Sequence, residues 1–327
     1  MDKGINYFGI DISKDVFDVV NSAGSYWQFE NNFKGFRKFL KELDITSHCV
    51  MESTGYYHQQ LAYFLLEKEI KVSVENPISV KRFIQMKLSK IKTDKSDAKM
   101  ICAYAESEEP KLWTGQSKHQ ITCLQMIRLV SVYFKQTTAL KNKIHGEKAL
   151  GNPCMDVVRS LNRSLKNLEK EISKIEEKVL KLVKIEHQDL LTRIETIPGL
   201  GKKTSIMLLV LTDGFERFTS SGELCSYAGL TPTIRQSGSS VRGKARISKM
   251  GNQKLRNLLF MCSFTACKHN KACKAIYDRI VAKGKSKKLA LIAVCNKLLK
   301  QAYAIAKSGL IYDKEYRSVN PALIAKS

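Results

Sequence analysis

Four acidic residues are the first candidates for chemistry, because acids are scarce in this chain. Asp11 ends an apolar segment in GIDISKD, Glu52 ends another in HCVME, and Asp94 and Asp97 stand three residues apart in KTDKSDAKMI. Residues i and i+3 share one face of a helix, and neighbouring strands of one sheet can end at the same edge. We therefore predict that the four carboxylates gather at one site. For Asp94 and Asp97 alone an alternative stays open, since acids also favour the first turn of a helix as caps and dipole partners.

A divalent metal ion would explain four acids in one place. Gathered carboxylates repel one another unless a cation lies between them, and Mg²⁺ prefers such hard oxygen ligands together with phosphate oxygens. Two such ions about 4 Å apart can hold the attacking and the leaving oxygen of a phosphodiester. We predict Mg²⁺, or Mn²⁺, as the cofactor, with Lys92, Lys95 and Lys99 beside it as phosphate ligands.

A second group of candidate residues lies between positions 235 and 256, where seven basic residues occur and no acid. Glycines and serines are interspersed among them, and a flexible loop of small and basic residues suits close approach to a phosphate backbone. A merely solvated run of charges usually mixes both signs. We predict nucleic-acid contacts from Arg235, Arg242, Lys244, Arg246, Lys249, Lys254 and Arg256.

The turn IPGLGKKTS, which begins at Ile197, resembles the turn of a helix-hairpin-helix motif. There Gly199 and Gly201 would let backbone amides approach a phosphate at a helix N-terminus, with Lys202 beside them. The alternative is a turn at a helix start whose glycines serve packing only.

The N-terminal third is predicted to form a mixed α/β sheet that positions the acids. Three meandering strands at 5–11, 16–22 and 25–31 are followed by alternating helices and strands, an order that places helices on the faces of a sheet. The later segments are helices at 33–43 and 57–68 and strands at 47–53 and 71–76. Beyond Pro77 the chain is predicted to be helical to about residue 105, with an interruption near KTDKSDAKMI.

The rest of the chain is predicted to be mainly helical. Apolar residues recur at alternating steps of three and four, which predicts a coiled-coil seam. The seam comprises Val158, Leu161, Leu165, Leu168, Ile172, Ile175, Val179 and Leu182. An amphipathic helix packed on its own domain is the alternative. We predict three domains: an α/β domain at 1–120, a helical coiled-coil segment at 121–190 and a mainly α domain at 191–327.

Composition points to a polyanionic partner. The chain has 327 residues, and its 55 Lys and Arg against 31 Asp and Glu give a net charge of +24, which favours nucleic acid. No apolar run approaches the ~18 residues of a membrane-spanning helix, and the start lacks the apolar stretch of a signal peptide. We therefore expect a cytoplasmic protein without a membrane partner. Nine cysteines with no C-x-x-C pair predict free thiols rather than disulfides or a zinc site.

The acids and the basic block together resemble the insertion sequence 110 family of transposases, which is similar to the Piv-type DNA invertases. G-I-D, M-E-S-T-G and K-T-D-K-S-D-A look like the DEDD signature of that family. IPGLG and the stretch YAGLTPTIRQSGSSVRGKARISKMGNQKLR supply a second signature in the C-terminal half, so the resemblance covers nearly the whole chain. It implies an RNase H-like, RuvC-type N-terminal domain. Met250 departs from the pattern, because the family usually has a basic residue there.

The resemblance also implies that Ser237, in the S-G step of the basic block, is the nucleophile. Ser239 and Ser240 stay open as alternatives. A serine needs a base to attack phosphorus, and this block contains neither a histidine nor an acid. We therefore expect the acids of the N-terminal domain, of the same subunit or of another, to complete the site.

The predicted function is that of a DNA transposase, which cuts and rejoins donor and target DNA through a metal-assisted serine–phosphodiester intermediate. The resemblance further implies guidance by a non-coding RNA from the mobile element. Strand exchange needs several active sites at once, so we predict a homo-oligomer, a dimer or a tetramer. Two alternatives stay open: a metal-only RuvC-like nuclease or junction resolvase that uses water, and a non-catalytic scaffold that binds nucleic acid.

Overall fold

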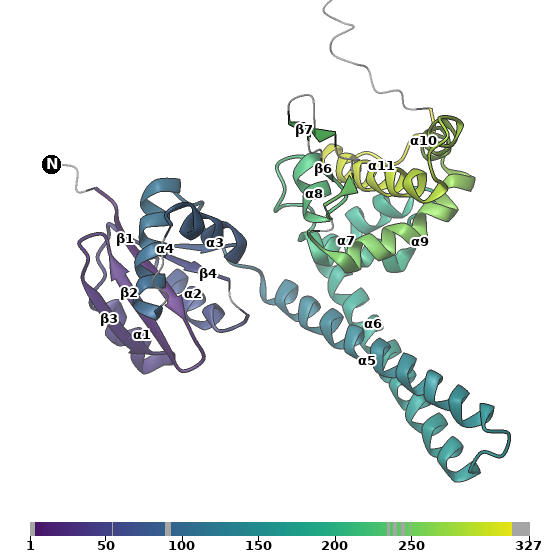
Figure 1. The fold of residues 1–327 in the computed structure, drawn as a ribbon, viewed down its shortest axis with the longest axis horizontal. Helices are drawn as coiled ribbons and strands as arrows, with labels where there is room; N and C mark the ends of the chain where they lie inside the picture. The colour runs from purple at the N-terminus through teal and green to yellow at the C-terminus, as the bar shows by residue number, and fades with distance from the viewer. Residues whose placement is uncertain are drawn as a thin grey trace, which may run out of the picture. The chain divides into compact units, whose positions relative to one another are not determined.

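A five-stranded sheet forms the centre of the first of two units into which the chain divides, Met1–Gln116 and Ser117–Ser327 (Figure 1). The computed structural model describes residues 4–53, 55–88, 93–233, 236–237, 241–242, 246–248 and 250–315. The strand order is β3-β2-β1-β4-β5; β1, β2 and β3 are antiparallel neighbours, and β4 and β5 run parallel to β1. The five strands are β1 (Asn6–Ile12), β2 (Val16–Asn21), β3 (Tyr26–Glu30), β4 (Ser47–Glu52) and β5 (Lys71–Glu75). All five predicted strands are confirmed, and the mixed sheet agrees with the predicted RNase H-like domain.

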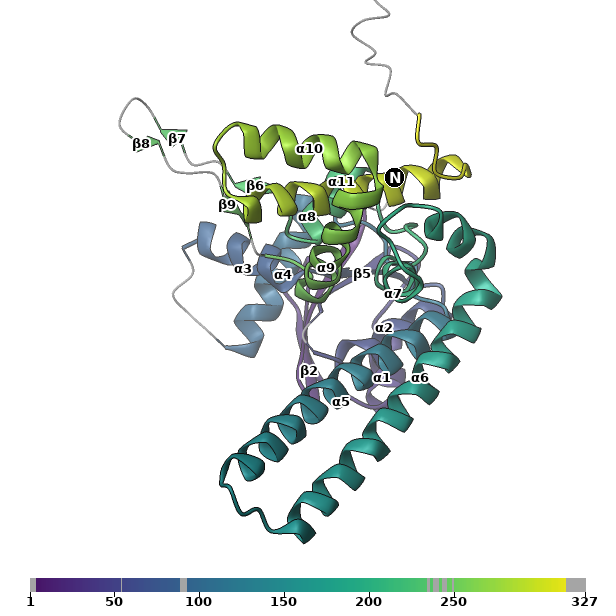
Figure 2. The same ribbon diagram turned by 90° about the vertical axis from the view of Figure 1, so that its right-hand side faces the viewer.

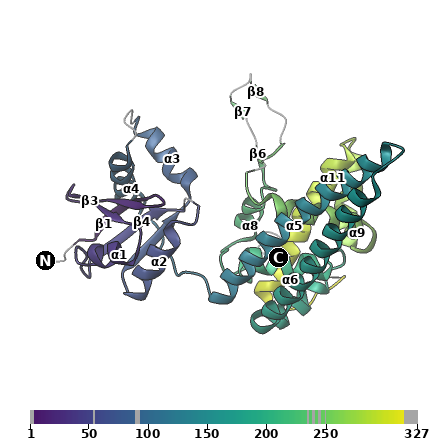
Figure 3. The same ribbon diagram turned by 90° about the horizontal axis from the view of Figure 1, so that it is seen from below.

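Helices cover both faces of this sheet (Figure 3). On one face, Phe8, Ile10 and Ile12 of β1 pack in a core with α1 (Phe33–Leu40) and α2 (His58–Glu67). On the other face, Tyr7 of β1 packs with α3 (Pro77–Met86) and α4 (Asp94–Glu108). This division follows from the strand itself, since successive side chains point to opposite faces.

In the second unit, two long helices form a hairpin beside a helical bundle (Figure 1). The hairpin helices are α5 (Lys118–Ala149) and α6 (Met155–Glu195), and the bundle contains α7 (Lys202–Thr212), α8 (Ser221–Tyr227), α9 (Gln253–His269), α10 (Lys271–Ala282) and α11 (Lys287–Ser308). Lys141 of α5 pairs with Glu169 of α6, whereas Ser117, at the start of α5, bonds to Glu186 further along α6. The two helices are therefore antiparallel.

The predicted heptad seam packs against α5 of the same chain. Val158, Ile172 and Val179 are buried, and the other seam residues are half-buried. The structure thus shows the packing expected of the alternative, an amphipathic helix within its own domain. Assembly of subunits through this seam stays a prediction.

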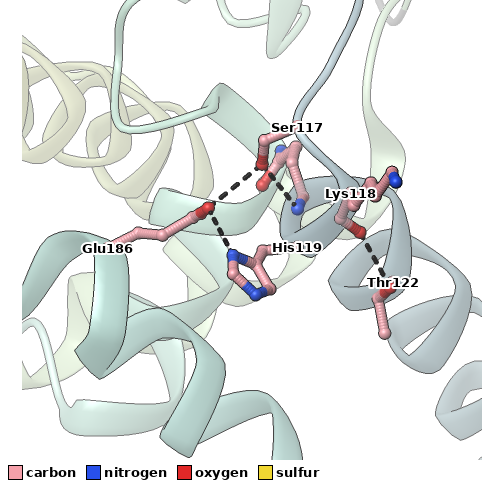
Figure 4. Close-up of polar contacts among 6 residues, drawn as sticks. Ser117, Lys118, His119, Thr122 and Glu186 are labelled. Atoms are coloured by element: carbon pink, nitrogen blue, oxygen red, sulfur yellow. Dashed lines mark hydrogen bonds and ion pairs between the residues drawn. The ribbon is translucent and has the colours of Figure 1, made fainter.

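The start of α5 is fixed to a kink in α6. His187 interrupts α6 with φ −136° and ψ 32°. Beside it, the Glu186 carboxylate accepts a hydrogen bond from the Ser117 hydroxyl at 3.1 Å and lies 3.0 Å from Nδ1 of His119 (Figure 4). Ser117 also caps α5, because its Oγ accepts from the backbone N–H of Gln120. One carboxylate therefore holds the first turn of the hairpin in place.

By length and composition, α11 is the one helix in the described part of the chain that could cross a membrane. Its residues Val294, Leu298 and Ala302 are completely buried in the core of the second unit. A core helix of a soluble protein passes the same test, so this helix gives only weak support for a membrane span.

Candidate functional site

Two of the predicted acids lie next to each other at the end of the sheet. β1 and β4 are parallel with Ile10 opposite Met51, and Asp11 and Glu52 are the residues that follow. Ile10 and Met51 both belong to the core with α1 and α2. Since side chains alternate along a strand, Asp11 and Glu52 are both on the face covered by α4.

The other two predicted acids occupy the first turn of α4. Thr93 precedes the helix and caps it: its Oγ1 accepts from the backbone N–H of Ser96 at 3.1 Å, and the Ser96 hydroxyl oxygen accepts from the backbone N–H of Thr93 at 2.9 Å. The helix is therefore capped by Thr93 and Ser96, and not by Asp94 or Asp97. A favourable interaction of these two acids with the helix dipole is compatible with their positions.

A glycine in β1 allows α4 to carry its acids close to Asp11. A Cβ atom on Gly9 would stand 2.2 Å from the backbone nitrogen of Cys102 and 2.3 Å from the carbonyl oxygen of Ala98. Tyr7, earlier in β1, contacts the same Cys102, whose Sγ lies 3.4 Å from the Tyr7 carbonyl oxygen. α4 therefore runs antiparallel to β1, and its first turn lies toward the end of β1 that holds Asp11.

The charges of the site converge on Asp11. Burial of this half-buried carboxyl raises its pKa to about 6, together with the negative charges of Asp97, Glu52 and Asp94 and, least of all, Asp18. Among the described residues, however, no three His, Cys, Asp or Glu side chains are placed so that they could share a metal ion. The two observations are compatible, because charges act over longer distances than ligand bonds. The four carboxylates are electrostatic neighbours without ligand geometry.

Asp18 is a fifth acid of this site that the sequence analysis missed. It lies directly opposite Asp11 in the pairing of β1 with β2 and is only 3% exposed. Its Oδ1 accepts hydrogen bonds from the Tyr26 hydroxyl at 2.5 Å and from Nε2 of Gln28 at 3.1 Å. The bond to Asp18 is the main reason why the pKa of Tyr26 is raised to about 12. An acid in the middle of the apolar strand VFDVVN was the available signal.

The lysines predicted to flank the acids are exposed where the structure describes them. Lys95 and Lys99 are on the surface of α4, and Nζ of Lys95 lies 4.7 Å from the centre of the Tyr26 ring. A cation over an aromatic face is favourable, so Tyr26 links Lys95 to Asp18. Lys92 lies outside the described residues.

The predicted basic loop contains two short β ladders. β6 (Pro232–Thr233) pairs with β9 (Arg246–Ile247), and β7 (Gln236–Ser237) pairs with β8 (Val241–Arg242), so that Ser237 is opposite Val241. Figure 2 shows β7 and β8 beyond β6 and β9. For Ser237, Arg242 and Arg246 only the backbone belongs to the described part. Arg235, Ser239, Ser240, Lys244 and Lys249 lie outside it.

The last two basic residues of this block belong to the first turn of α9. Nζ of Lys254 donates a hydrogen bond to Oγ of Ser131 on α5 at 2.7 Å. Arg256 is half-buried, and its Nη1 donates to the carbonyl of Ala228 at 2.9 Å. The contact described for Arg256 is therefore structural, while Lys254 is exposed. Met250 is 51% exposed, so the departure from the family pattern is on the surface.

The turn between α6 and α7 supports different roles for its two glycines. Gly199 has φ +108°, and a Cβ there would lie 2.7 Å from the Cβ of Ala266 on α9. Its conformation and its packing both require glycine, which agrees with the packing alternative. Gly201 is exposed and precedes α7 without a side-chain cap, and Lys202 is exposed in the first turn.

Comparison with known proteins gives two family matches. Residues 191–278 match the family described as "Transposase IS116/IS110/IS902 family". Residues 8–147 match a further family described as "Transposase". The second region contains the four predicted acids, and the first contains Ser237.

Two relatives align over almost the whole chain, and a third aligns over about half of it. The chain is 31% identical over 323 residues to the "Pilin gene-inverting protein" of Moraxella bovis, covering 94% of this chain and 98% of that protein. It is 25% identical to the "Transposase for insertion sequence element IS1111A" of Coxiella burnetii, with 90% of this chain and 88% of that protein covered. An uncharacterized insertion element IS110 protein of Streptomyces coelicolor is 30% identical over 157 residues, which cover 48% of this chain and 38% of that protein.

Proposed function

This chain belongs to the IS110 family of transposases, and we propose that it cuts and rejoins DNA strands through a covalent link between Ser237 and a DNA phosphate. The observation that carries the metal-assisted part of this proposal is the convergence of negative charge on Asp11 from Asp97, Glu52 and Asp94. Those carboxylates come from two parallel strands and one helix, and Gly9 allows the close approach of that helix. The role of Ser237 is supported by the family resemblance of the basic block.

The cation proposed for this site is Mg²⁺ or Mn²⁺. Asp11, Glu52, Asp94 and Asp97 fit such an ion in charge and in chemistry, because their hard oxygen atoms are the ligands that it prefers. The raised pKa of Asp11 supports this fit, since it reflects negative charge that a cation would neutralise. When bound, the ion would supply positive charge at the phosphate oxygens.

In the proposed reaction, Oγ of Ser237 attacks the phosphorus of a phosphodiester. A bond forms between Oγ and phosphorus, the bond from phosphorus to one deoxyribose oxygen breaks, and that oxygen takes up a proton as the serine loses one. The phosphoserine link keeps the free energy of the phosphodiester, so a new deoxyribose hydroxyl can displace the serine by the reverse steps. Basic residues of the 235–256 block would stabilise the charge that develops at the phosphate.

We propose a DNA substrate and an RNA guide as partners of the reaction. The substrate is donor and target DNA, brought together by a homo-oligomer. We also propose an RNA from the mobile element as a guide, which is supported by the family resemblance and by the net charge of +24. Purification of the protein from its host, followed by sequencing of the bound nucleic acid, tests the guide; recovery of DNA without any RNA of the element would remove it.

The test of the nucleophile is Ser237→Ala in the full chain. Labelled DNA that carries the recombination site is incubated with Mg²⁺, and covalent protein–DNA adducts are separated on a denaturing gel. We expect the adduct to disappear, because alanine has no oxygen with which to attack, while binding to the same DNA persists. Ser239→Ala and Ser240→Ala are the matched controls and should retain the adduct.

Other results of this experiment would reject the serine mechanism. A Ser237→Ala variant that still forms the adduct would move the nucleophile elsewhere. Strand cleavage by Ser237→Ala without an adduct would indicate the metal-only nuclease, in which water attacks. Activity that survives both a chelator and Asp11→Asn would show that the four acids have no part in the chemistry.

A further inference from the structure

Three basic residues from two helices are grouped around Ser131 in the second unit. Arg128, Ser131 and Lys135 follow one another on α5 at steps of three and four, which places them on one face of the helix. Lys254 of α9 reaches this face and donates its hydrogen bond to Oγ of Ser131 at 2.7 Å. The positive charges of Arg128 and Lys135 act on this ammonium group. We name Arg128, Lys135 and Lys254 the α5–α9 cation cluster.

The two helices that form the α5–α9 cation cluster contain almost no acid. In α9 there is none, and the only acid of α5 is Glu147, whose carboxylate pairs with Lys143 at 2.6 Å. Elsewhere on the hairpin, Lys141 pairs with Glu169 and Lys174 pairs with Glu171. A solvated charged surface usually mixes both signs in this way.

Lys254 lies in a positively charged environment. Burial lowers the pKa of Lys254, and the positive charges of Arg128 and Lys135 lower it further. Like charges that are held together destabilise a protein unless an anion offsets them. The hydroxyl of Ser131 is fixed in turn by donating to the carbonyl of Ile127 at 2.8 Å. The position of the Lys254 ammonium group is therefore set by α5.

We propose that the α5–α9 cation cluster binds the phosphate backbone of a nucleic-acid duplex. Seven residues separate Arg128 from Lys135, a rise of about 10 Å along the helix. Phosphates of one strand follow at about 3.4 Å along a duplex axis, so the cluster matches roughly three successive phosphates. Contacts of this kind position the duplex without reading its sequence.

This site differs from the predicted basic block, from which it takes only Lys254. It rests on the proposed function only in taking nucleic acid as the ligand, and it does not depend on the serine chemistry or on the four acids. Arg128 and Lys135 lie more than 90 residues before Ser237 in the sequence and were not among the residues predicted to bind nucleic acid.

The test compares two double variants of the full chain, each of which removes two positive charges. Arg128→Gln with Lys135→Gln removes the α5 part of the cluster. Lys141→Gln with Lys174→Gln is the matched control on the same hairpin, where each lysine is already paired with an exposed carboxylate. Binding of a fluorescent DNA duplex, and of an RNA duplex of the same sequence, is measured by anisotropy over a range of salt concentrations without divalent ions.

For the first double variant we expect the slope of log K against log salt to fall by about 2, one unit for each phosphate that the variant no longer neutralises. When the salt concentration rises fourfold, the factor by which the affinity falls would then be roughly sixteen times smaller for the variant than for the wild type. The control should keep the wild-type slope. A smaller slope with DNA alone, with RNA alone or with both supports the site and identifies its duplex.

Equal slopes for the first double variant and the wild type, with both duplexes, would overturn the proposal. Equal reductions of the slope in the two double variants would overturn the proposal as well, because the slope would then depend only on the net charge of the protein. Ser131→Glu serves if the first variant does not fold: it keeps all three cations, offers them an internal carboxylate, and should reduce the slope in the same way. Loss of the covalent adduct in the Ser237→Ala experiment leaves these binding results unchanged, so the two proposals fail separately.

Discussion

In Asp11, burial and the negative charges of neighbouring carboxylates both oppose ionisation of the carboxyl group. Its folded-state pKa of about 6 lies above the ordinary value of an aspartate. A carboxyl whose pKa is raised by folding contributes stability below its unfolded pKa, and this contribution is lost as the pH rises through about 6. In metal-free buffer the ionised Asp11 therefore destabilises the folded protein at pH 7 and above.

Asp11→Asn should consequently raise the melting temperature of the first unit at pH 7.5 in the presence of a chelator. It should also flatten the change of that melting temperature between about pH 4 and 6, the range between the unfolded and the folded pKa of Asp11. Mg²⁺ or Mn²⁺ should stabilise the wild type and have less effect on the variant, because ligand binding to the folded state adds stability. Differential scanning calorimetry at several pH values measures both effects. Asp15→Asn, an exposed acid of the same unit, is the control and should change neither; a lower melting temperature for Asp11→Asn would contradict the electrostatic account.

Residue types were enough to single out four of the acids, but not to find Asp18. Asp11, Glu52, Asp94 and Asp97 end apolar strands or open a helix, and such positions are visible in the sequence. The role of Asp18 depends on the pairing that places it opposite Asp11, and on the hydroxyl of Tyr26. Register between strands is a property of the folded sheet, so a single sequence did not disclose it.

At the scale of elements, the approach of α4 to β1 holds the candidate site together. Gly9→Ala would put a methyl group within 2.3 Å of two backbone atoms of α4. Backbone atoms cannot rotate away from the new methyl group as a side chain could, so α4 must move away from β1. We expect a loss of about 1–3 kcal/mol in the free energy of unfolding of the first unit, together with weaker binding of Mn²⁺, because Asp94 and Asp97 move with the helix.

Urea unfolding and isothermal titration with Mn²⁺ measure the two effects of Gly9→Ala. Gly4→Ala is the matched control, because a Cβ at Gly4 meets no atom within 4 Å. It should leave stability within about 0.5 kcal/mol of the wild type. Undiminished Mn²⁺ affinity in a destabilised Gly9→Ala variant would show that the position of α4 has no influence on the acids.

Elements with a clear apolar period were predictable, and elements without one were not. Alternation located β1 to β5, and the heptad located α6, because each pattern buries one face. The heptad pattern did not show whether the seam packs against α5 or against a second subunit, because either can cover the same apolar stripe of α6. The ladders β6–β9 and β7–β8 were missed because strands of two residues in a stretch of glycine, serine and arginine carry no period.

At the scale of the whole molecule, each unit has a hydrophobic core of its own, so we expect two unfolding transitions instead of one. The chain offers a direct way to separate them: its two tryptophans, Trp27 and Trp113, both belong to the first unit, whereas α5 to α11 dominate the far-ultraviolet circular dichroism. Gly9→Ala should shift the fluorescence transition alone. Gly199→Ala, which forces a side chain at φ +108° against Ala266, should shift the dichroism transition alone. Coincident transitions, moved together by either substitution, would mean that the two units unfold as one.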